Sequence, residues 1–185
     1  MGVIFVILDA QLTFSGGQLR LLNPDHVHQG YIDGLNDPDI NKYLVGVKCF
    51  TQTTKSVIYY VQCNIESPRS ILWGIWQQGS KLHCGTVRLH GIDTCHGIAH
   101  IGICLFDKAS WGNRIGSRAI NAVTNWAHDY LKLRWIEAGV YAENLSSQKA
   151  FLDAGYDWIS DISGKFLLDG NPSVVKIYAA LKNFN

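Results

Sequence analysis

The residues from Trp111 to Gly116 join an expected strand to an expected helix through a turn that contains two glycines. At such a junction the unpaired backbone N–H groups and the positive end of the helix dipole point the same way, which makes a generic anion site. The alternative is a tight turn without a ligand, which is the commoner use of glycines at such junctions. A dinucleotide-binding fingerprint and a Walker lysine are both absent, so hydride transfer and P-loop phosphoryl transfer lose their usual support.

The histidines and cysteines do not have the spacing of metal ligands, and we expect no metal. His96 and His100 would share a strand face but lie about 13 Å apart at 3.3 Å per residue, too far for one ion. Five cysteines without a C-x-x-C pair fit neither a disulfide framework nor a zinc ribbon, which indicates a reducing cytoplasm. Cys104 has no recognisable adjacent base, so a small buried residue is preferred over an acyl-cysteine nucleophile.

The length and net charge of the chain exclude further classes of protein. A chain of 185 residues with 47% apolar residues predicts one compact domain rather than a disordered protein. The net charge of +1 gives no broad field to attract nucleic acid or anionic lipid, so neither is an expected partner. The run from Val3 to Leu8 is too short to span a bilayer and lacks a basic leader segment. We expect an N-terminal extension over residues 1–16, an extra strand or a disordered start, and a single domain over residues 17–185.

The hydrophobic pattern predicts alternating strands and helices in the second half of the chain. Ile115, Ala119, Val123, Trp126 and Tyr130 recur at helical steps and mark one apolar face of a long helix. The two strands that flank this helix should be parallel neighbours within an otherwise antiparallel sheet, because a crossover helix joins them. The expected strands cover residues 19–22, 71–76, 82–90, 98–106, 135–142, 158–168 and 174–181, of which 98–106 and 135–142 flank the long helix. The other helices lie near residues 26–35, 37–44, 54–61 and 146–154.

Several separated segments together resemble one family, the GNAT acetyltransferases, in the branch of ribosomal-protein acetyltransferases (RimJ/RimL type). The resemblance covers about residues 19 to 181 and rests on landmarks in the family's order. These are Leu35-Asn36-Asp37-Pro38, Ala99-His100-Ile101-Gly102, Trp111-Gly112-Asn113-Arg114-Ile115-Gly116-Ser117, Ala138-Gly139-Val140-Tyr141-Ala142-Glu143-Asn144 with Ser147, and Ala154-Gly155-Tyr156.

The resemblance implies an α/β (α+β) fold that binds acetyl-CoA as co-substrate. It implies a mixed, mostly antiparallel sheet whose two central parallel strands splay apart, with helices on both sides. The pyrophosphate would meet the turn at Arg114, Ile115, Gly116 and Ser117, and pantetheine would run along Ile103, Cys104 and Leu105, with Asn144 and Ser147 on its other side. Arg114 replaces a family glycine, so we expect a conformation open to any residue there and a looser phosphate cradle. Its guanidinium could contact a phosphate directly, or could be a solvated surface charge.

The resemblance also implies which residues move protons. The family's general base often stands where this chain has His100, and an imidazole with an ordinary pKa of about 6.5 suits the task. A hydrogen-bonded histidine at the edge of the core is the alternative. Glu137 and Glu143 are reserve bases, and Tyr141 could donate a hydrogen bond to the departing thiolate. The family's acid is often a tyrosine at the position of Phe151, so that acid is missing.

The expected activity is transfer of an acetyl group to a primary amine in a ternary complex. We expect a small-molecule acceptor, and an amino sugar is favoured because Tyr43, Trp73 and Trp76 could stack on a sugar ring. A protein N-terminus is the alternative acceptor, and a second copy of the chain is a further candidate partner. A non-catalytic acyl-CoA-binding module and a purely structural domain are the other classes.

Overall fold

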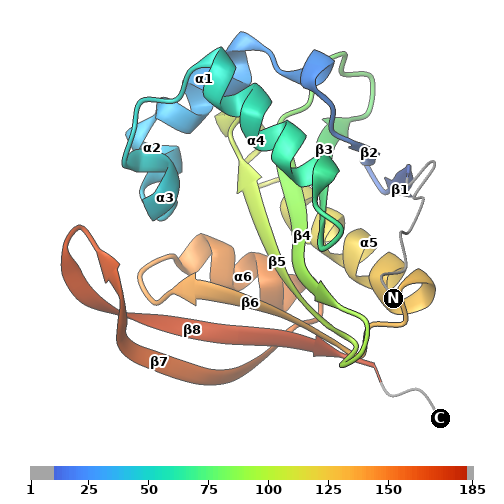
Figure 1. Ribbon diagram of the computed structural model, residues 1–185, viewed down its shortest axis with the longest axis vertical. Helices are drawn as coiled ribbons and strands as arrows, with labels where there is room; N and C mark the ends of the chain where they lie inside the picture. Colours follow the sequence, from blue (N-terminus) through green and yellow to red (C-terminus); the bar gives the residue numbers. More distant parts are fainter. Residues whose placement is uncertain (1–10, 183–185) are drawn as a thin grey trace.

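The computed structural model describes residues 11–182, which form one mixed sheet covered by helices on both faces (Figure 1). In the described part of the chain the sheet has eight strands in the order β1-β2-β3-β4-β5-β6-β8-β7. The strands are β1 (Leu12–Phe14), β2 (Gly17–Leu21), β3 (Ser70–Gln77), β4 (Gly85–Asp93), β5 (Ile98–Leu105), β6 (Trp135–Tyr141), β7 (Asp157–Leu168) and β8 (Asn171–Leu181). This confirms the predicted mixed, mostly antiparallel sheet.

The helices divide between the two faces of the sheet. A short η1 (Pro24–His26) and then α1 (Gln29–Asn36), α2 (Pro38–Asn41), α3 (Val45–Lys48) and α4 (Thr54–Glu66) lie on one side. The other side carries α5 (Ile115–Tyr130) and α6 (Leu145–Asp153), and a short η2 (Lys108–Ser110) follows β5. The helix expected over residues 26–35 is two elements, because Asn23 caps η1 and His28 caps α1.

The predicted parallel pair is confirmed, and it is short. Between the described residues of β5 and β6, pairing is confined to Ile98↔Trp135, Ala99↔Ile136 and His100↔Glu137. Both strands continue past these pairs, β5 to Leu105 and β6 to Tyr141, so they diverge after His100 and Glu137. The backbone edge of residues 101–105 that faces β6 is therefore left without a strand partner.

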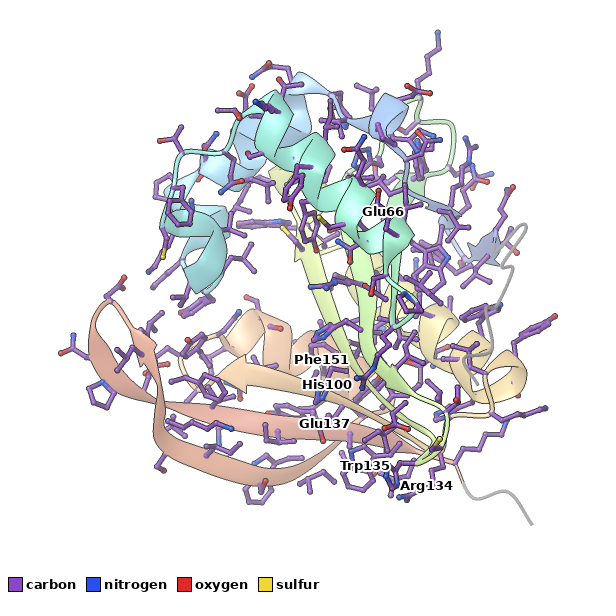
Figure 2. All side chains as sticks on the ribbon, viewed as in Figure 1. Glu66, His100, Arg134, Trp135, Glu137 and Phe151 are labelled. Carbon is purple, nitrogen blue, oxygen red and sulfur yellow. The ribbon has the colours of Figure 1, made fainter. Side chains whose placement is uncertain are left out.

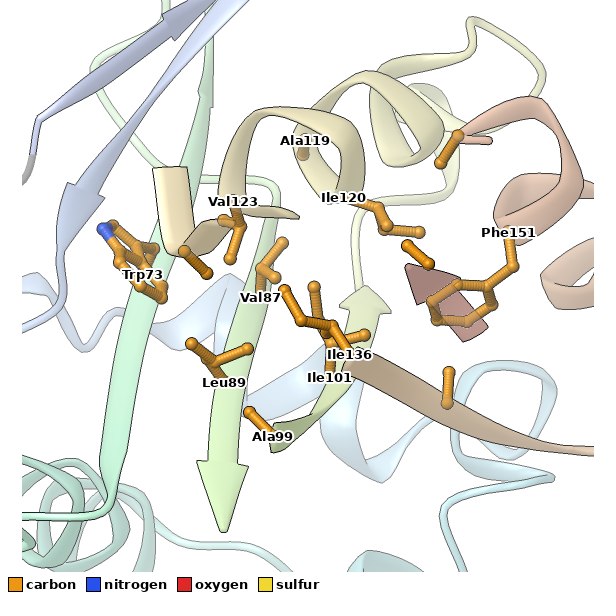
Figure 3. Close-up of a cluster of buried hydrophobic side chains, with 14 of the residues drawn as sticks. Trp73, Val87, Leu89, Ala99, Ile101, Ala119, Ile120, Val123, Ile136 and Phe151 are labelled. Atoms are coloured by element: carbon orange, nitrogen blue, oxygen red, sulfur yellow. The ribbon is translucent and has the colours of Figure 1, made fainter. Parts of the chain in front are cut away.

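The main core lies between the sheet and helices α5 and α6 (Figure 3). The side chains of Ile115, Ala119 and Val123 are buried there, as the helical pattern predicts. Tyr130, the last residue of that pattern, is 72% exposed and stacks on Trp126 at 5.9 Å between ring centroids. Ala127 and the C-cap residue Leu131 are buried near the same end of α5, so the buried face of the helix continues there and leaves Tyr130 to one side.

The C-terminal hairpin inserts β8 beside β6 and leaves β7 at the edge of the sheet. The turn is only Asp169-Gly170, since Leu168 already pairs with Asn171. Both turn residues have positive φ, 51° and 79°, which suits the tight two-residue hairpin turns that asparagine, aspartate and glycine favour. Strand β8 is thus longer than expected and begins at Asn171.

The segment before β2 adds a strand to the sheet. β1 pairs with β2, and Arg118 Nη1 on α5 donates a hydrogen bond of 3.0 Å to the carbonyl of Ser15. The apolar run from Val3 to Leu8 lies outside the described residues. Within residues 11–182, no helix combines the length and apolar character needed to cross a bilayer.

His83 gives the stability of the fold a predictable pH dependence. The residue is 3% exposed, and its ring packs against the rings of Trp76, Phe106 and His28. Burial lowers the pKa of His83 to about 3, and the charges of His28 and His26 lower it in the same direction. An unfolded imidazole titrates near pH 6.5, so between these values the unfolded chain binds a proton that the folded chain does not. The free energy of unfolding should therefore fall as the pH falls from about 6.5 towards 3.

Thermal unfolding of the variant His83→Phe against pH tests this expectation. The variant should lose part of the acid destabilisation, because the group with the lowered pKa is gone. His96→Phe, at an exposed turn, should keep the slope of the wild-type protein. Equal slopes for the wild-type protein and His83→Phe would contradict the assignment to His83.

Candidate active site

His100 and Glu137 form a pair at the point where β5 and β6 separate (Figure 2). The Nδ1 atom of His100 lies 3.2 Å from Oε1 of Glu137. The second carboxylate oxygen, Oε2, accepts a 2.9 Å hydrogen bond from the indole Nε1 of Trp135. Each oxygen of Glu137 thus has one partner, and the carboxylate is held in a fixed orientation beside the imidazole.

This arrangement suits His100 for taking up a proton. A carboxylate at Nδ1 favours the tautomer with the hydrogen on Nδ1, which leaves the lone pair of Nε2 free to accept a proton. The His100 side chain is 49% exposed and that of Glu137 is 28% exposed, so a ligand can reach the ring. The structure brings together the predicted base, His100, and the first of its two reserves, Glu137.

His90 and Gly91 pack against the His100 ring. The His90 ring stacks on it with centroids 5.4 Å apart, and burial, followed by the charges of Arg88 and His100, lowers the pKa of His90 to about 4. His90 is therefore uncharged at neutral pH and does not repel a protonated His100. A Cβ on Gly91, whose φ is +61°, would lie 2.9 Å from Cδ2 of His100, so this close approach requires glycine.

The strand alternation places Arg88, Gly102 and Cys104 on the same face as His100, towards α4. Arg88 is the register partner of Gly102. A Cβ at Gly102 would meet no heavy atom of the described residues within 4 Å, so open space lies in front of this position. Burial raises the pKa of the Cys104 thiol to about 12, so Cys104 is a neutral thiol at physiological pH. This supports the structural role expected for Cys104.

The turn before α5 has the features of an anion site. Gly112 and Arg114 both have positive φ, 78° and 56°, and Arg114 is the N-cap residue of α5 without a side-chain cap hydrogen bond among the described residues. The expectation of an ordinary conformation at Arg114 was therefore wrong: the arginine adopts the left-handed conformation of the glycine it replaces. A Cβ on Gly116 would lie 3.3 Å from side-chain atoms of Ile103 and Leu105, so glycine brings the helix close to β5.

The remaining predicted site residues lie further from the His100–Glu137 pair. Tyr141, four residues beyond Glu137 on β6, lies about 13 Å along the strand at 3.3 Å per residue. Its hydroxyl donates a 2.9 Å hydrogen bond to the carbonyl of Leu167. Glu143 accepts a hydrogen bond from Ser173 at 3.2 Å. The structure thus does not bring Tyr141 or Glu143 to the pair.

Asn144 and Ser147 form the beginning of α6. The side-chain oxygen of Asn144 accepts a 3.1 Å hydrogen bond from the backbone N–H of Ser147, which makes Asn144 the N-cap. Phe151, one turn further along, is 2% exposed and packs against Tyr156 with ring centroids 5.2 Å apart. A phenylalanine has no proton to donate, so position 151 supplies no acid.

Two hollows of the surface lie away from this site. One, of about 810 Å³, lies between β1 and α5, and the other, of about 490 Å³, lies beside α1 and His83. The described lining of neither includes His100 or Glu137. Within residues 11–182, no three His, Cys, Asp or Glu side chains group in a way that could hold a metal ion.

Comparison with known families decides between the possible uses of this geometry. Residues 18–157 match the model of the acetyltransferase (GNAT) domain. The chain belongs to the GNAT acetyltransferase family. A member of this family uses acetyl-CoA as the acyl donor.

Relatives of this GNAT chain include proteins with different acceptors. It is 26% identical over 117 residues to the uncharacterized N-acetyltransferase YoaA of Bacillus subtilis, a match that spans 63% of this chain and 66% of that protein. The structure resembles RimL, a ribosomal L7/L12 alpha-N-protein acetyltransferase in complex with coenzyme A, with TM-score 0.78, 18% identity and coverage of 92% and 97%. It also resembles spermidine N-acetyltransferase from Vibrio cholerae in complex with CoA and spermine, with TM-score 0.77, 19% identity and coverage of 90% and 96%.

The residues of this GNAT chain fit acetyl-CoA. The uncapped N-terminus of α5 after Arg114 offers backbone N–H groups to an anionic pyrophosphate. The edge of β5 from Ile103 to Leu105, unpaired by β6, offers backbone groups to an extended amide-containing chain. The two features lie side by side, because Gly116 packs on Ile103 and Leu105.

Arg114→Gly separates the backbone of this turn from its guanidinium. An arginine in the left-handed region costs about 1–2 kcal/mol that glycine does not, offset by about 0.5–1 kcal/mol of chain entropy. The free energy of unfolding should therefore stay the same or rise slightly. If the guanidinium contacts a phosphate, KM for acetyl-CoA should rise several-fold when that contact is removed. Thermal unfolding and steady-state kinetics measure the two effects.

Lys132→Gly is the matched control, because Lys132 at the other end of α5 also has a positive φ, 55°. It should change stability in the same way and leave KM unchanged. An unchanged KM in Arg114→Gly would show that Arg114 is a solvated surface charge.

Proposed function

We propose that this protein transfers an acetyl group from acetyl-CoA to a primary amine of a small molecule by direct attack in a ternary complex. The observation that carries the proposal is the His100–Glu137 pair, held at the point where β5 and β6 stop pairing. This is the point at which a thioester threaded between the two strands would meet a base. The family gives the reaction class, and this geometry supports the roles that we propose for the residues.

Separate groups of residues transfer the proton and bind acetyl-CoA in this proposal. Nε2 of His100 takes the proton that the amine loses as its nitrogen attacks the thioester carbonyl, and Glu137 stabilises the imidazolium that forms. Acetyl-CoA supplies the activated acetyl group. The turn and first residues of α5, namely Arg114, Ile115, Gly116 and Ser117, hold its pyrophosphate, and Ile103, Cys104 and Leu105 bind its pantetheine with Asn144 and Ser147 opposite. The C–S bond breaks as the N–C bond forms, and the thiolate takes a proton from solvent, because the Tyr141 hydroxyl donates its hydrogen bond to Leu167 instead.

The acceptor we favour is an amino sugar, with a protein N-terminus as the alternative. The expected stacking platform was wrong for two of its members, because Trp73 and Trp76 are 0% and 3% exposed and cannot touch a ligand. Tyr43, half-buried, stacks on Tyr141 instead, with ring centroids 6.2 Å apart. An amino sugar therefore has to be recognised by polar groups near His100 rather than by tryptophan stacking.

The proposal includes a cytoplasmic setting and assembly of two copies. Cysteines outside any disulfide, such as the exposed Cys49 and Cys63, suit a reducing compartment. The edge strand β7 leaves Trp158 and Phe166 exposed by 54% and 40%, and an unpaired edge with apolar side chains suits pairing with a second copy. Sedimentation of the purified protein tests the assembly.

A thiol-release assay with acetyl-CoA and a panel of amines tests the proposed activity. We expect free CoA and acetylated amine in equal amounts, with the product identified by mass spectrometry. Transfer to a protein N-terminus and to no small amine would favour the alternative acceptor. Tight binding of CoA in calorimetry with no transfer to any amine would overturn catalysis and indicate a non-catalytic module.

A further inference from the structure

Arg88 brings a positive charge close to the proposed reaction point. It lies on β4 opposite Gly102, and His90, two residues on, lies opposite His100. Diagonal neighbours in an antiparallel pair have Cα atoms roughly 7–8 Å apart, so Arg88 and His100 share one face at this spacing. A Cβ at Gly102 would meet nothing within 4 Å among the described residues, so the space in front of Gly102, on the face that carries Arg88 and His100, is open.

The guanidinium of Arg88 is fixed in position without an anionic partner. Its Nε donates a 3.1 Å hydrogen bond to the hydroxyl of Ser70, and its central carbon lies 5.7 Å from the ring centroid of Tyr60. No described carboxylate lies within 4.0 Å of it. Burial raises the pKa of Tyr60, so its hydroxyl is neutral and does not supply a negative charge.

A half-buried arginine without a counter-ion is unusual for a structural residue. A charge removed from water costs free energy unless an opposite charge or several hydrogen bonds compensate for it. The guanidinium has more N–H groups than Ser70 and Tyr60 can use, and its planar fork matches a carboxylate or phosphate. The face towards α4 therefore presents an anion-binding group near Gly102 and a carboxylate-supported base at His100.

We propose that Arg88 binds an anionic group, a carboxylate or a phosphate, of the acceptor while its amine meets His100. The inference rests on the proposed acetyl transfer and names the substrate class: a small primary amine that carries a negative charge within a few bonds of the nitrogen. In such an acceptor the negative group would face the positive charge of Arg88, and the amine would face His100 and the negative charge of Glu137. An acceptor with only positive charges would be repelled by Arg88.

Matched pairs of amines that differ only in the anionic group test this inference. The pairs are glycine and glycinamide, L-alanine and L-alaninamide, phosphoethanolamine and ethanolamine, and phosphorylated glucosamine and glucosamine. For at least one pair, kcat/KM should be roughly 10- to 100-fold higher for the charged member, as expected for a hydrogen-bonded contact between two charged groups. The carboxylate and phosphate pairs show which kind of anion the site takes.

Two variants then assign the preference to Arg88. In Arg88→Gln the ratio of kcat/KM within the preferred pair should fall to near 1, mainly through KM. In Arg88→Lys, which keeps the charge and loses the planar fork, an intermediate ratio is expected. An Arg88→Gln variant with the wild-type ratio, or a wild-type protein that uses both members of every pair equally, would overturn the inference and leave the proposed acetyl transfer intact.

Absence of turnover with every amine would overturn the proposed acetyl transfer instead. Calorimetric titration of the CoA-loaded protein with the same pairs then tests Arg88 by binding alone. Binding of a charged member that is lost in Arg88→Gln supports the inference, and equal binding of both members overturns it.

Discussion

Replacing His100 by alanine is expected to lower kcat by roughly 100- to 10,000-fold, the range that a positioned general base contributes. The reason is the loss of Nε2 as proton acceptor beside the diverging strands, where Glu137 holds the ring at 3.2 Å. KM for acetyl-CoA should change little, because the turn before α5 is separate from His100. Steady-state kinetics across a pH series measure both effects, and the acidic limb of the wild-type rate profile should disappear in His100→Ala.

His96→Ala is the matched control for this experiment. His96 lies four residues earlier, in the exposed turn before β5. It should leave both the rate and the pH profile unchanged. A His100→Ala variant with an unchanged pH profile would show that another group removes the proton, and Glu137 would be the first residue to examine.

Introducing a side chain at Gly102 is expected to block the site without unfolding the protein. A Cβ there meets no described heavy atom within 4 Å, and the residue does not have a positive φ. Valine also favours strands, so the melting temperature of Gly102→Val should not fall. In contrast, kcat/KM should fall by roughly 10- to 100-fold, because the valine occupies the space between Arg88 and His100 that a substrate needs.

A graded series supplies the control for Gly102. Gly102→Ala should reduce activity less than Gly102→Val, and Gly102→Leu more, whereas the melting temperatures should stay close to that of the wild-type protein. Loss of activity that follows loss of stability, or full activity in Gly102→Leu, would contradict the placement of substrate on this face of the sheet.

The fold could be predicted where the pattern of the sequence is regular. The helix from Ile115 to Tyr130 shows a long apolar period, and its position between two apolar runs predicts that their strands are parallel neighbours. Parallel strands on either side of a crossover helix must begin at the same end of the sheet. His100 and Glu137 are each the third residue of their strand, so the common start brings them into register. Their pairing could therefore have been predicted from the sequence.

Other parts of the site depend on register that the sequence does not display. Sequence reasoning missed His90 and Arg88, because their role follows from pairing β4 with β5 through a β-bulge after His90. The alternation of Arg88 and His90 with buried Val87 and Leu89 was the available signal. Trp135 was missed as a partner of Glu137, although residues two apart on a strand share a face.

For Arg114, Trp73 and Trp76, predictions made from the type of residue alone were wrong. The surrounding turn holds Arg114 in a left-handed conformation in spite of its side chain, since the entry into α5 is fixed by neighbours such as Gly112 and Gly116. Trp73 and Trp76 looked available for ligand stacking, but they fill the cores on opposite faces of β3. Whether an aromatic side chain packs or binds depends on the layers around it.

Acetyl transfer and CoA affinity measured on the same preparations of wild-type protein and His100→Ala test the central claim most directly. The claim predicts that the wild-type protein converts acetyl-CoA and an amine into equal amounts of free CoA and acetylated amine. It also predicts that His100→Ala binds CoA with unchanged affinity in calorimetry while transfer falls by at least roughly 100-fold. Transfer by His100→Ala at the wild-type rate, with CoA bound equally well, would contradict it.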